Sequence, residues 1–318
     1  MRGYLVVNPN ATATSPRTRD VLVHALAAEH DIEVIETSHR GHAEQIGRLA
    51  RAERADIVVA LGGDGTVNEL VNGLLAQSGP GPDVPVVTAV PAGSANVFCR
   101  ALGFPVDPVE ATGMVLEGLR ENRVRTISLG HLRASRADGS TLHRWFLFNA
   151  GLGVDAEVIH AMEDLREQGH TASTGRYVQV ALEQILRHTD RRNPALTVTR
   201  PGVPPVDHVF VAIVQNTAPW TFLGSVPINP SPRASFDTGL DLWAPRTLSL
   251  LPTLRHARRM VTGSKAGSTR RGLLAIHDAT ELGFETSRPV ALQVDGEGLG
   301  NVCQAQMTVE RRALRVIV

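Results

Sequence analysis

Hydrophobic residues alternate between two kinds of spacing from the start of the chain to Asn122. Short apolar, largely β-branched runs predict strands, and apolar residues that recur with helical spacing predict helices between them. The strands are expected at residues 4–7, 32–35, 55–59 and 84–90, and the helices around residues 21–26, 43–50, 67–75 and 96–102. This alternation is typical of a parallel α/β sheet, whose ligands bind where the C-terminal ends of the strands meet.

Beyond Asn122 the helical spacing gives way to short apolar runs separated by turn residues, such as Ala137-Asp138-Gly139-Ser140. This pattern predicts a mainly antiparallel β-sandwich domain over residues 124–300, after an α/β domain over residues 1–123. Its strands are expected at residues 125–132, 145–148, 196–199, 206–214, 240–243, 273–277, 280–284 and 290–294, with helical stretches at residues 156–167 and 177–186.

The loop Gly62-Gly63-Asp64-Gly65-Thr66 connects the third strand of the α/β domain to a helix. A strand, a glycine-rich turn and a helix N-terminus in this order present backbone N–H groups to an anion, so the loop predicts a phosphate site. Its glycines are expected to take positive φ angles and to let a phosphate approach without a Cβ in the way. Asn8, Thr37 and Ser94 follow the other three strands, so four turns should converge on one crevice.

Asp64 stands in the middle of this glycine loop. An acid in a phosphate cradle repels its ligand unless a cation or a transferable proton lies between them, so Asp64 is a candidate for chemistry. The alternative is a helix-capping aspartate, which is common in strand-to-helix turns. Thr66 and Glu69 have the spacing of a capping box, which would free Asp64 for another role.

Two well-known nucleotide-binding loops do not fit this sequence. A Walker A loop needs a lysine before its Ser or Thr and a protein kinase needs a strand lysine, whereas the chain has a single lysine, Lys265, far from the loop. The dinucleotide fingerprint would have Gly in place of Asn68, and its acid about twenty residues further on would be Asp83, which lies in a Gly/Pro turn. A hydride-transfer enzyme is therefore disfavoured.

The 318 residues carry 32 basic and 32 acidic side chains, and the net charge of zero gives no general attraction to nucleic acid. Aromatic residues make up 4% of the chain, too few for stacking platforms, so we expect no nucleic-acid partner. Cys99 and Cys303 fit neither a disulfide framework nor a zinc site, and His39 and His42 are expected at the surface. The chain shows no signal-peptide or transmembrane pattern, which predicts a cytoplasmic protein.

A second acidic turn, Asp295-Gly296-Glu297, follows an apolar strand. Asp-Gly is a common pair in hairpin turns, so a surface hairpin is one interpretation. If the turn instead faces the glycine loop, Glu297 and Asp64 form a carboxylate pair that can take a proton from a hydroxyl beside Mg²⁺-bound phosphates.

From Leu242 to His277 the chain has no acidic residue. Its basic residues predict a patch that rests on anionic lipid headgroups, each contributing about 1 kcal/mol near such a surface. The alternative is a solvated helix face with an Arg-rich loop, in which the leucines are core residues. The basic residues are Arg246, Arg255, Arg258, Arg259, Lys265, Arg270 and Arg271, and the leucines are Leu248, Leu250, Leu251 and Leu254. The candidates to face a membrane are Arg255, Arg258, Arg259, Arg270 and Arg271.

Several short motifs occur in a fixed order over nearly the whole chain. They are Asn8-Pro9, the glycine loop with Asn68-Glu69, Pro91-Ala92-Gly93-Ser94-Ala95-Asn96, Asn149-Ala150-Gly151-Leu152-Gly153 with Asp155, and Asp295-Gly296-Glu297. In this order they resemble the diacylglycerol kinase catalytic-domain family, which includes the bacterial soluble lipid kinases and the sphingosine kinases. The glycine loop alone is less specific, because NAD kinases and phosphofructokinases are similar there.

The resemblance implies an ATP-dependent lipid kinase whose active site lies between an N-terminal nucleotide-binding α/β domain and a C-terminal β-sandwich domain. It implies that residues 301–318 return to the N-terminal domain. Glu297 would be the general base for the lipid hydroxyl, and Asp64 would hold the catalytic Mg²⁺ or share the proton transfer. The implied ATP contacts are Asn8, Pro9, Asn10, Thr37, Gly62, Gly63, Asp64, Gly65, Thr66, Val67, Asn68, Glu69, Gly93 and Ser94.

The chain departs from the family pattern at three places. The stretch Asn8-Pro9-Asn10-Ala11-Thr12 lacks the glycine usual in the first loop, and Val97 stands where the family usually carries Asp. Many bacterial members bind a structural Mg²⁺ at an Asp-Asp-Gly turn, of which Phe236-Asp237-Thr238-Gly239 keeps only part. Asp237 is therefore the candidate ligand for that metal.

Together these observations favour transfer of the γ-phosphoryl group of ATP to a lipid hydroxyl, with diacylglycerol as the acceptor and phosphatidic acid as the product. The enzyme would be cytoplasmic and in peripheral contact with an anionic membrane surface. Two alternatives stay open: phosphorylation of a soluble acceptor, as in NAD kinases, and a nucleotide- or lipid-binding module without turnover. The sequence leaves the oligomeric state open, and a homodimer is one option.

Overall fold

The structure, a computed structural model, describes residues 1–11, 15–28, 31–153, 156–157, 193–249, 255, 258–261 and 272–318. Its contacts divide the chain into two compact units, Met1–Leu129 with Arg311–Val318 and Gly130–Glu310. The helical stretches predicted at residues 156–167 and 177–186 lie outside the described residues, except for residues 156–157. The same holds for Thr12, Asp155, Leu250, Leu251, Leu254, Lys265, Arg270 and Arg271.

The first unit is a parallel sheet with helices on both faces, as its alternating pattern predicts. Its strands, in spatial order, are β2 (Asp31–Glu36), β1 (Arg2–Val7), β3 (Ile57–Gly62), β4 (Val86–Pro91) and the end of β16 (Glu297–Ile317). Val316 of β16 pairs with Val87 in parallel register. β3 is buried at every position, as expected for a central parallel strand that is covered on both faces.

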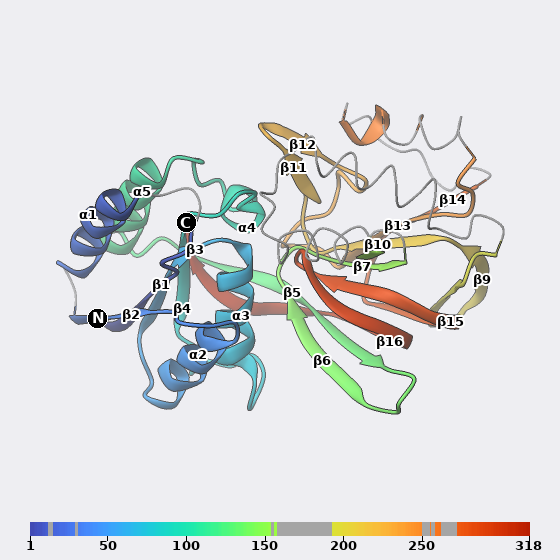
Figure 1. The fold of residues 1–318 in the computed structure, drawn as a ribbon, viewed down its shortest axis with the longest axis horizontal. Helices are drawn as coiled ribbons and strands as arrows, with labels where there is room; N and C mark the ends of the chain where they lie inside the picture. Colours follow the sequence, from blue (N-terminus) through green and yellow to red (C-terminus); the bar gives the residue numbers. More distant parts are fainter. Residues whose placement is uncertain are drawn as a thin grey trace. The chain divides into compact units, whose positions relative to one another are not determined.

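Two helices cover each face of this sheet (Figure 1). The helices of the unit are α1 (Pro16–Ala27), α2 (His42–Ala52), α3 (Asp64–Leu75), α4 (Val97–Ala101) and α5 (Pro108–Arg120). α1 contacts α5 on one face, and α2 packs against α3 on the other. Glycines at the contact let α2 and α3 pack closely. A Cβ at Gly73 would overlap the carbonyl oxygen of Glu44, and a Cβ at Gly47 would overlap that of Leu70.

Most strands of the second unit form antiparallel ladders that branch from β15 (Glu281–Val294), and a separate pair, Thr221–Leu223 with Val226–Ile228, lies outside this sheet. Its other strands are β5 (Val124–Ser135), β6 (Thr141–Phe146), β7 (Asn149–Gly153), β8 (Leu196–Arg200), β9 (Val203–Val209), β10 (Val211–Gln215), β11 (Thr221–Leu223), β12 (Val226–Ile228), β13 (Leu240–Pro245) and β14 (Leu273–Ala279). One half of β15 pairs with β8, and the other half pairs with β7, which leads to β10, β13 and β14. β16 runs antiparallel to β15. β5 pairs with both β16 and β6.

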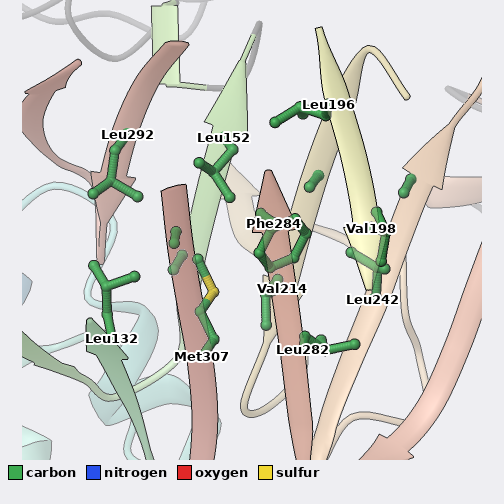
Figure 2. Close-up of a cluster of buried hydrophobic side chains, with 14 of the residues drawn as sticks. Leu132, Leu152, Leu196, Val198, Val214, Leu242, Leu282, Phe284, Leu292 and Met307 are labelled. Carbon is green, nitrogen blue, oxygen red and sulfur yellow. The ribbon is translucent and has the colours of Figure 1, made fainter. Parts of the chain in front are cut away.

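Side chains from both branches meet in one hydrophobic core, as Figure 2 shows. Leu196 and Val198 of β8 lie in the same cluster as Leu152 of β7 and Leu242 of β13. Two layers of strands with a shared apolar interior form a β-sandwich, so the predicted fold class of the chain is confirmed.

The strands of the second unit differ from the predicted ones at several places. The predicted strands at residues 280–284 and 290–294 form the single strand β15, with a register shift between Glu285 and Val290. The predicted strand at residues 206–214 is divided into β9 and β10 at Phe210, whose N–H donates to Pro245 O instead. β7 was missed because Asn149 and two glycines give it no β-branched signal.

None of the described helices is long and apolar enough to span a bilayer.

Candidate functional site

The carboxyl ends of β1 and β3 form the topological switch point of the parallel sheet, because β2 lies beyond β1 whereas β4 lies beyond β3. Ligands of open α/β sheets bind at such a point. Backbone hydrogen bonds link the ends of neighbouring strands at this point. Asn8 N–H donates to Leu61 O at 2.9 Å, Thr37 N–H to Val7 O at 2.8 Å and Ala92 N–H to Gly62 O at 3.0 Å. The four turns predicted to converge therefore share one edge of the sheet and are bonded to one another.

The first residue of α3 lies earlier in the glycine loop than the capping-box prediction requires. The helix begins at Asp64 with Gly63 as its N-cap and no side-chain cap, so the prediction that Thr66 caps it is wrong. Thr66 lies in the first helical turn, and its Oγ1 accepts from Asn8 Nδ2 at 3.2 Å. Glu69 Oε1 accepts from Gly41 N at 2.9 Å. Both side chains tie neighbouring turns to α3 and leave the first N–H groups of the helix for a ligand.

The glycines of the loop let other groups pack close to its backbone, and they do not provide positive φ angles. None of Gly62, Gly63 and Gly65 has a positive φ angle, so that part of the prediction is wrong. A Cβ at Gly62 would lie 2.8 Å from Thr66 Cβ, and a Cβ at Gly93 would lie 2.6 Å from Gly63 Cα. The loop after β3 and the loop after β4 thus touch backbone to backbone, an approach that a Cβ at Gly93 would prevent without a shift of the backbone.

Asp64 joins the same two loops through its side chain. One carboxylate oxygen accepts from Val97 N at 2.9 Å and the other from Phe98 N at 3.0 Å, at the start of α4. Burial raises the pKa of the Asp64 carboxyl, and the N–H groups of Phe98 and Val97 act in the opposite direction. Asp64 is therefore a capping aspartate, though for α4 and not for its own helix. The carboxylate is thus an acceptor for the N–H groups at the start of α4, and its chemical role stays a prediction.

The other predicted ATP contacts divide into edge residues and interior residues. Asn8 Oδ1 accepts from Asn10 N at 3.0 Å beside Pro9, and Ser94 is exposed next to Gly93. Val67 and Asn68 are each only 1% exposed and lie inside the unit, where Asn68 Oδ1 accepts from Asn72 Nδ2. Any contact of these two residues with ATP would thus be through the backbone or through their neighbours.

The second acidic turn is a two-residue hairpin, as one interpretation of the sequence predicts. Val294 pairs with Glu297, and the intervening Asp295 and Gly296 have φ angles of 48° and 81°. Positive φ at both positions is the signature of a type I′ turn. Glu297 pairs with Arg144 of β6 at 3.1 Å, and the two side chains are 19% and 13% exposed. Glu297 and Asp64 belong to different units, and their proximity stays a prediction.

Sequence reasoning missed two residues beside Glu297. Arg144 carries no local signal, since its partner is 153 residues away in sequence. Asp295 was assigned only to the turn, yet its buried carboxylate accepts from the N–H groups of Leu147, Phe148 and Asn149 at 2.7, 3.0 and 3.0 Å. The preference of Asp for turns indicates its place but not these bonds.

No group of three His, Cys, Asp or Glu side chains within the described ranges is arranged to hold a metal ion. The candidate ligand Asp237 is exposed, and its N–H donates to Ser235 Oγ at 3.2 Å. Mg²⁺ commonly takes only one or two protein carboxylates together with substrate phosphates and water. Asp64 at the sheet edge meets that requirement, so the residues present fit a nucleotide-bound Mg²⁺ but form no complete protein cage.

The basic patch is described only in part. Arg255 and Arg258 are exposed and Arg259 is half-buried, while Arg270 and Arg271 lie outside the described residues. A separate pocket of about 430 Å³ lies in the second unit, and its lining includes Arg133, His143 and Glu281. It contains none of the predicted site residues.

Comparisons with known proteins find sequence similarity in the first part of the chain. Residues 2–132 match the sequence profile described as the diacylglycerol kinase catalytic domain. The chain is 35% identical over 114 residues to a protein of Chromohalobacter salexigens named "Probable lipid kinase YegS-like", and 31% identical over 119 residues to a diacylglycerol kinase of Staphylococcus aureus. The aligned segments cover 36% and 37% of this chain and 36% of each relative, so the chain matches only about a third of the length of these curated relatives.

Solved structures match over almost the whole chain. A diacylglycerol kinase of Bacillus anthracis superposes with a TM-score of 0.71 at 19% identity, covering 99% of this chain and 96% of that one. A yeast NADH kinase in complex with NADH superposes with a TM-score of 0.55 at 14% identity, covering 99% and 82%. At these identities the likeness shows a shared fold and nothing finer.

Proposed function

Since residues 2–132 match the diacylglycerol kinase catalytic domain, we propose that the chain is an ATP-dependent lipid kinase. The proposed reaction transfers the γ-phosphoryl group of ATP to a lipid hydroxyl, with diacylglycerol as the acceptor and phosphatidic acid as the product. The observation that carries this proposal is the N-terminus of α3 at the switch point, where a Cβ at Gly65 would meet nothing within 4 Å, so that phosphates have room beside it.

The residues of the first unit would bind the nucleotide. The free N–H groups of the first turn of α3 would face the phosphates, and Asn8 and Thr37 would line the neighbouring strand ends. The site lacks a lysine, so Mg²⁺ would neutralise the phosphate charge when it is bound with ATP, and Asp64 is the residue placed to orient it. Binding and orientation supply most of the rate enhancement in phosphoryl transfer.

Glu297 would act on the acceptor as the general base. Its carboxylate takes the proton of the lipid hydroxyl while the hydroxyl oxygen bonds to the γ-phosphorus and the bond to the β,γ-bridging oxygen of ATP breaks, leaving ADP. This assignment requires a charged carboxylate. The Arg144 guanidinium, 3.1 Å from this carboxylate, would hold it in place for the step.

The proposal is tested by incubating the chain with radiolabelled ATP and three acceptors: diacylglycerol in mixed micelles, a total lipid extract, and NAD. We expect label in an organic-soluble phospholipid and ADP formation that depends on the lipid. Label in NADP alone would replace the lipid with a soluble acceptor. ATP binding without ADP release for any acceptor would instead identify a binding module without turnover.

Contact with an anionic membrane surface is a further part of the proposal. Replacing Arg258 and Arg259 with glutamate should weaken binding to vesicles with anionic lipid by at least about 30-fold, since each basic residue near such a surface contributes about 1 kcal/mol. Vesicle co-sedimentation measures the effect. The matched control is Arg17→Glu with Arg54→Glu, two exposed arginines of the first unit with the same change of charge. Equal loss in both double variants would point to net charge and not to this patch.

A further inference from the structure

The hairpin that carries Glu297 is held by a ring of buried polar contacts. Asp295 N–H donates to Asn149 O at 2.9 Å, and Asn149 Oδ1 accepts from Gln293 Nε2 at 2.8 Å. Gln293 Oε1 in turn accepts from Gly296 N at 3.0 Å. Asn149, Gln293 and Asp295 are each at most 5% exposed, so these bonds are shielded from water.

The Asp295 carboxylate completes this ring from the side chain. It receives the N–H groups of Leu147, Phe148 and Asn149, where the chain bends from β6 into β7. In this bend Leu147 and Phe148 belong to no strand ladder, and a buried N–H without an acceptor is costly. The carboxylate therefore fixes the bend and the type I′ turn against each other.

Arg144 ties the same segment to Glu297 from its other end. It lies in β6, three residues before Leu147, and its guanidinium holds the Glu297 carboxylate at 3.1 Å. The segment from Arg144 to Asn149 is thus bonded to the hairpin at both ends. With both carboxylates of the turn engaged, the Glu297 side chain has a fixed direction and a counter-charge.

We infer that Arg144 and Asp295 are positioning residues for Glu297. Asp295 sets the place of the Glu297 backbone through the bend, and Arg144 sets the direction of its carboxylate. This inference rests on the proposed function for its effect on turnover, because the kinase role of Glu297 belongs to that proposal. The contacts themselves are independent of it and can be tested separately.

The direct test is hydrogen–deuterium exchange of the native chain and of Asp295→Asn. An asparagine side chain has one acceptor oxygen and an N–H₂ group, so it cannot receive all three N–H groups. We expect amide exchange at Leu147 to Asn149 to rise at least tenfold. Asp138→Asn is the control, since Asp138 is an exposed turn residue whose carboxylate accepts from Ser140 N. Unchanged exchange at Leu147 to Asn149 in a folded Asp295→Asn would overturn the inference.

Kinetics of Arg144 variants test the effect on Glu297. Arg144→Gln should lower kcat by about 10²-fold with the KM for ATP unchanged, since misplacing a reacting group by about 1 Å has that effect. Arg144→Lys keeps the positive charge and should restore much of the lost kcat. Arg136→Gln, in which a guanidinium bonded only to Leu299 O in the described contacts is removed, is the control.

The kinetic outcomes separate the two proposals. A native chain that phosphorylates no acceptor would remove the proposed function, and the exchange experiment would still decide the contacts. An active native chain whose Arg144→Gln variant keeps its kcat would remove the positioning role and leave the kinase in place.

Discussion

Replacing Glu297 with glutamine should lower kcat by about 10²–10⁴-fold, the range for loss of a general base. The amide keeps the size of the side chain and accepts from Arg144, so the hairpin should stay folded. It cannot take the proton of the acceptor hydroxyl. The change is measured as the initial rate of lipid phosphorylation at saturating ATP, together with ATP affinity by calorimetry.

ATP affinity should not change in this variant, because Glu297 belongs to the other unit from the glycine loop. Glu285→Gln is the matched control, since Glu285 is an exposed glutamate on β15 of the same unit. A Glu297→Gln rate within threefold of the native one would assign the base to another group. Equal losses in both variants would indicate general damage to the β-sandwich unit.

The second large effect is expected from Gly73→Ala in α3. A Cβ at this position would overlap the backbone of Glu44, so α2 and α3 must separate. Overpacking of this kind costs about 1–3 kcal/mol or more. Because α3 begins at Asp64, the displacement should also weaken ATP binding. Urea unfolding followed by circular dichroism, with ATP titration, measures both effects.

Gly113→Ala is the matched control for this prediction. Gly113 also lies inside a helix, α5, but a Cβ there would meet nothing within 4 Å. Alanine is favoured over glycine in a helix by about 0.5–1 kcal/mol, so the control should be slightly more stable than the native chain. Equal urea midpoints for both variants would contradict the tight packing of α2 on α3.

The first unit was predictable because its central strands are buried on both faces. β1, β3 and β4 are apolar at nearly every position, and glycine-containing turns follow two of them. The second unit was harder to predict. β16 exposes polar residues at many of its positions, and the only expectation for this part of the chain was that residues 301–318 return to the N-terminal domain. β7 begins with a buried asparagine whose bonding depends on Trp220, far away in sequence.

The candidate site shows the same division between local and distant information. That Asn8, Gly63 and Gly93 reach one edge follows from strand order, which the alternation of strands and helices predicts. The bonds of Asp64 cross 33 and 34 residues and those of Asp295 cross 146 to 148. No pattern within a window of sequence encodes such pairings. A carboxylate that looks chemical in a motif can thus also be a structural acceptor.

Val316 pairs with Val87, so the α/β unit is assembled from the two ends of the described chain. During translation its first 129 residues leave the ribosome long before this pairing strand is made. The side of β4 that receives Val316 stays unpaired while the intervening 181 residues, Gly130 to Glu310, are synthesised. Domains usually fold in order as they emerge, but here the first unit is complete only after the sandwich unit has been synthesised. Arrest of synthesis before residue 311 would therefore yield a chain with an open sheet edge, which chaperones must shield from pairing with other chains.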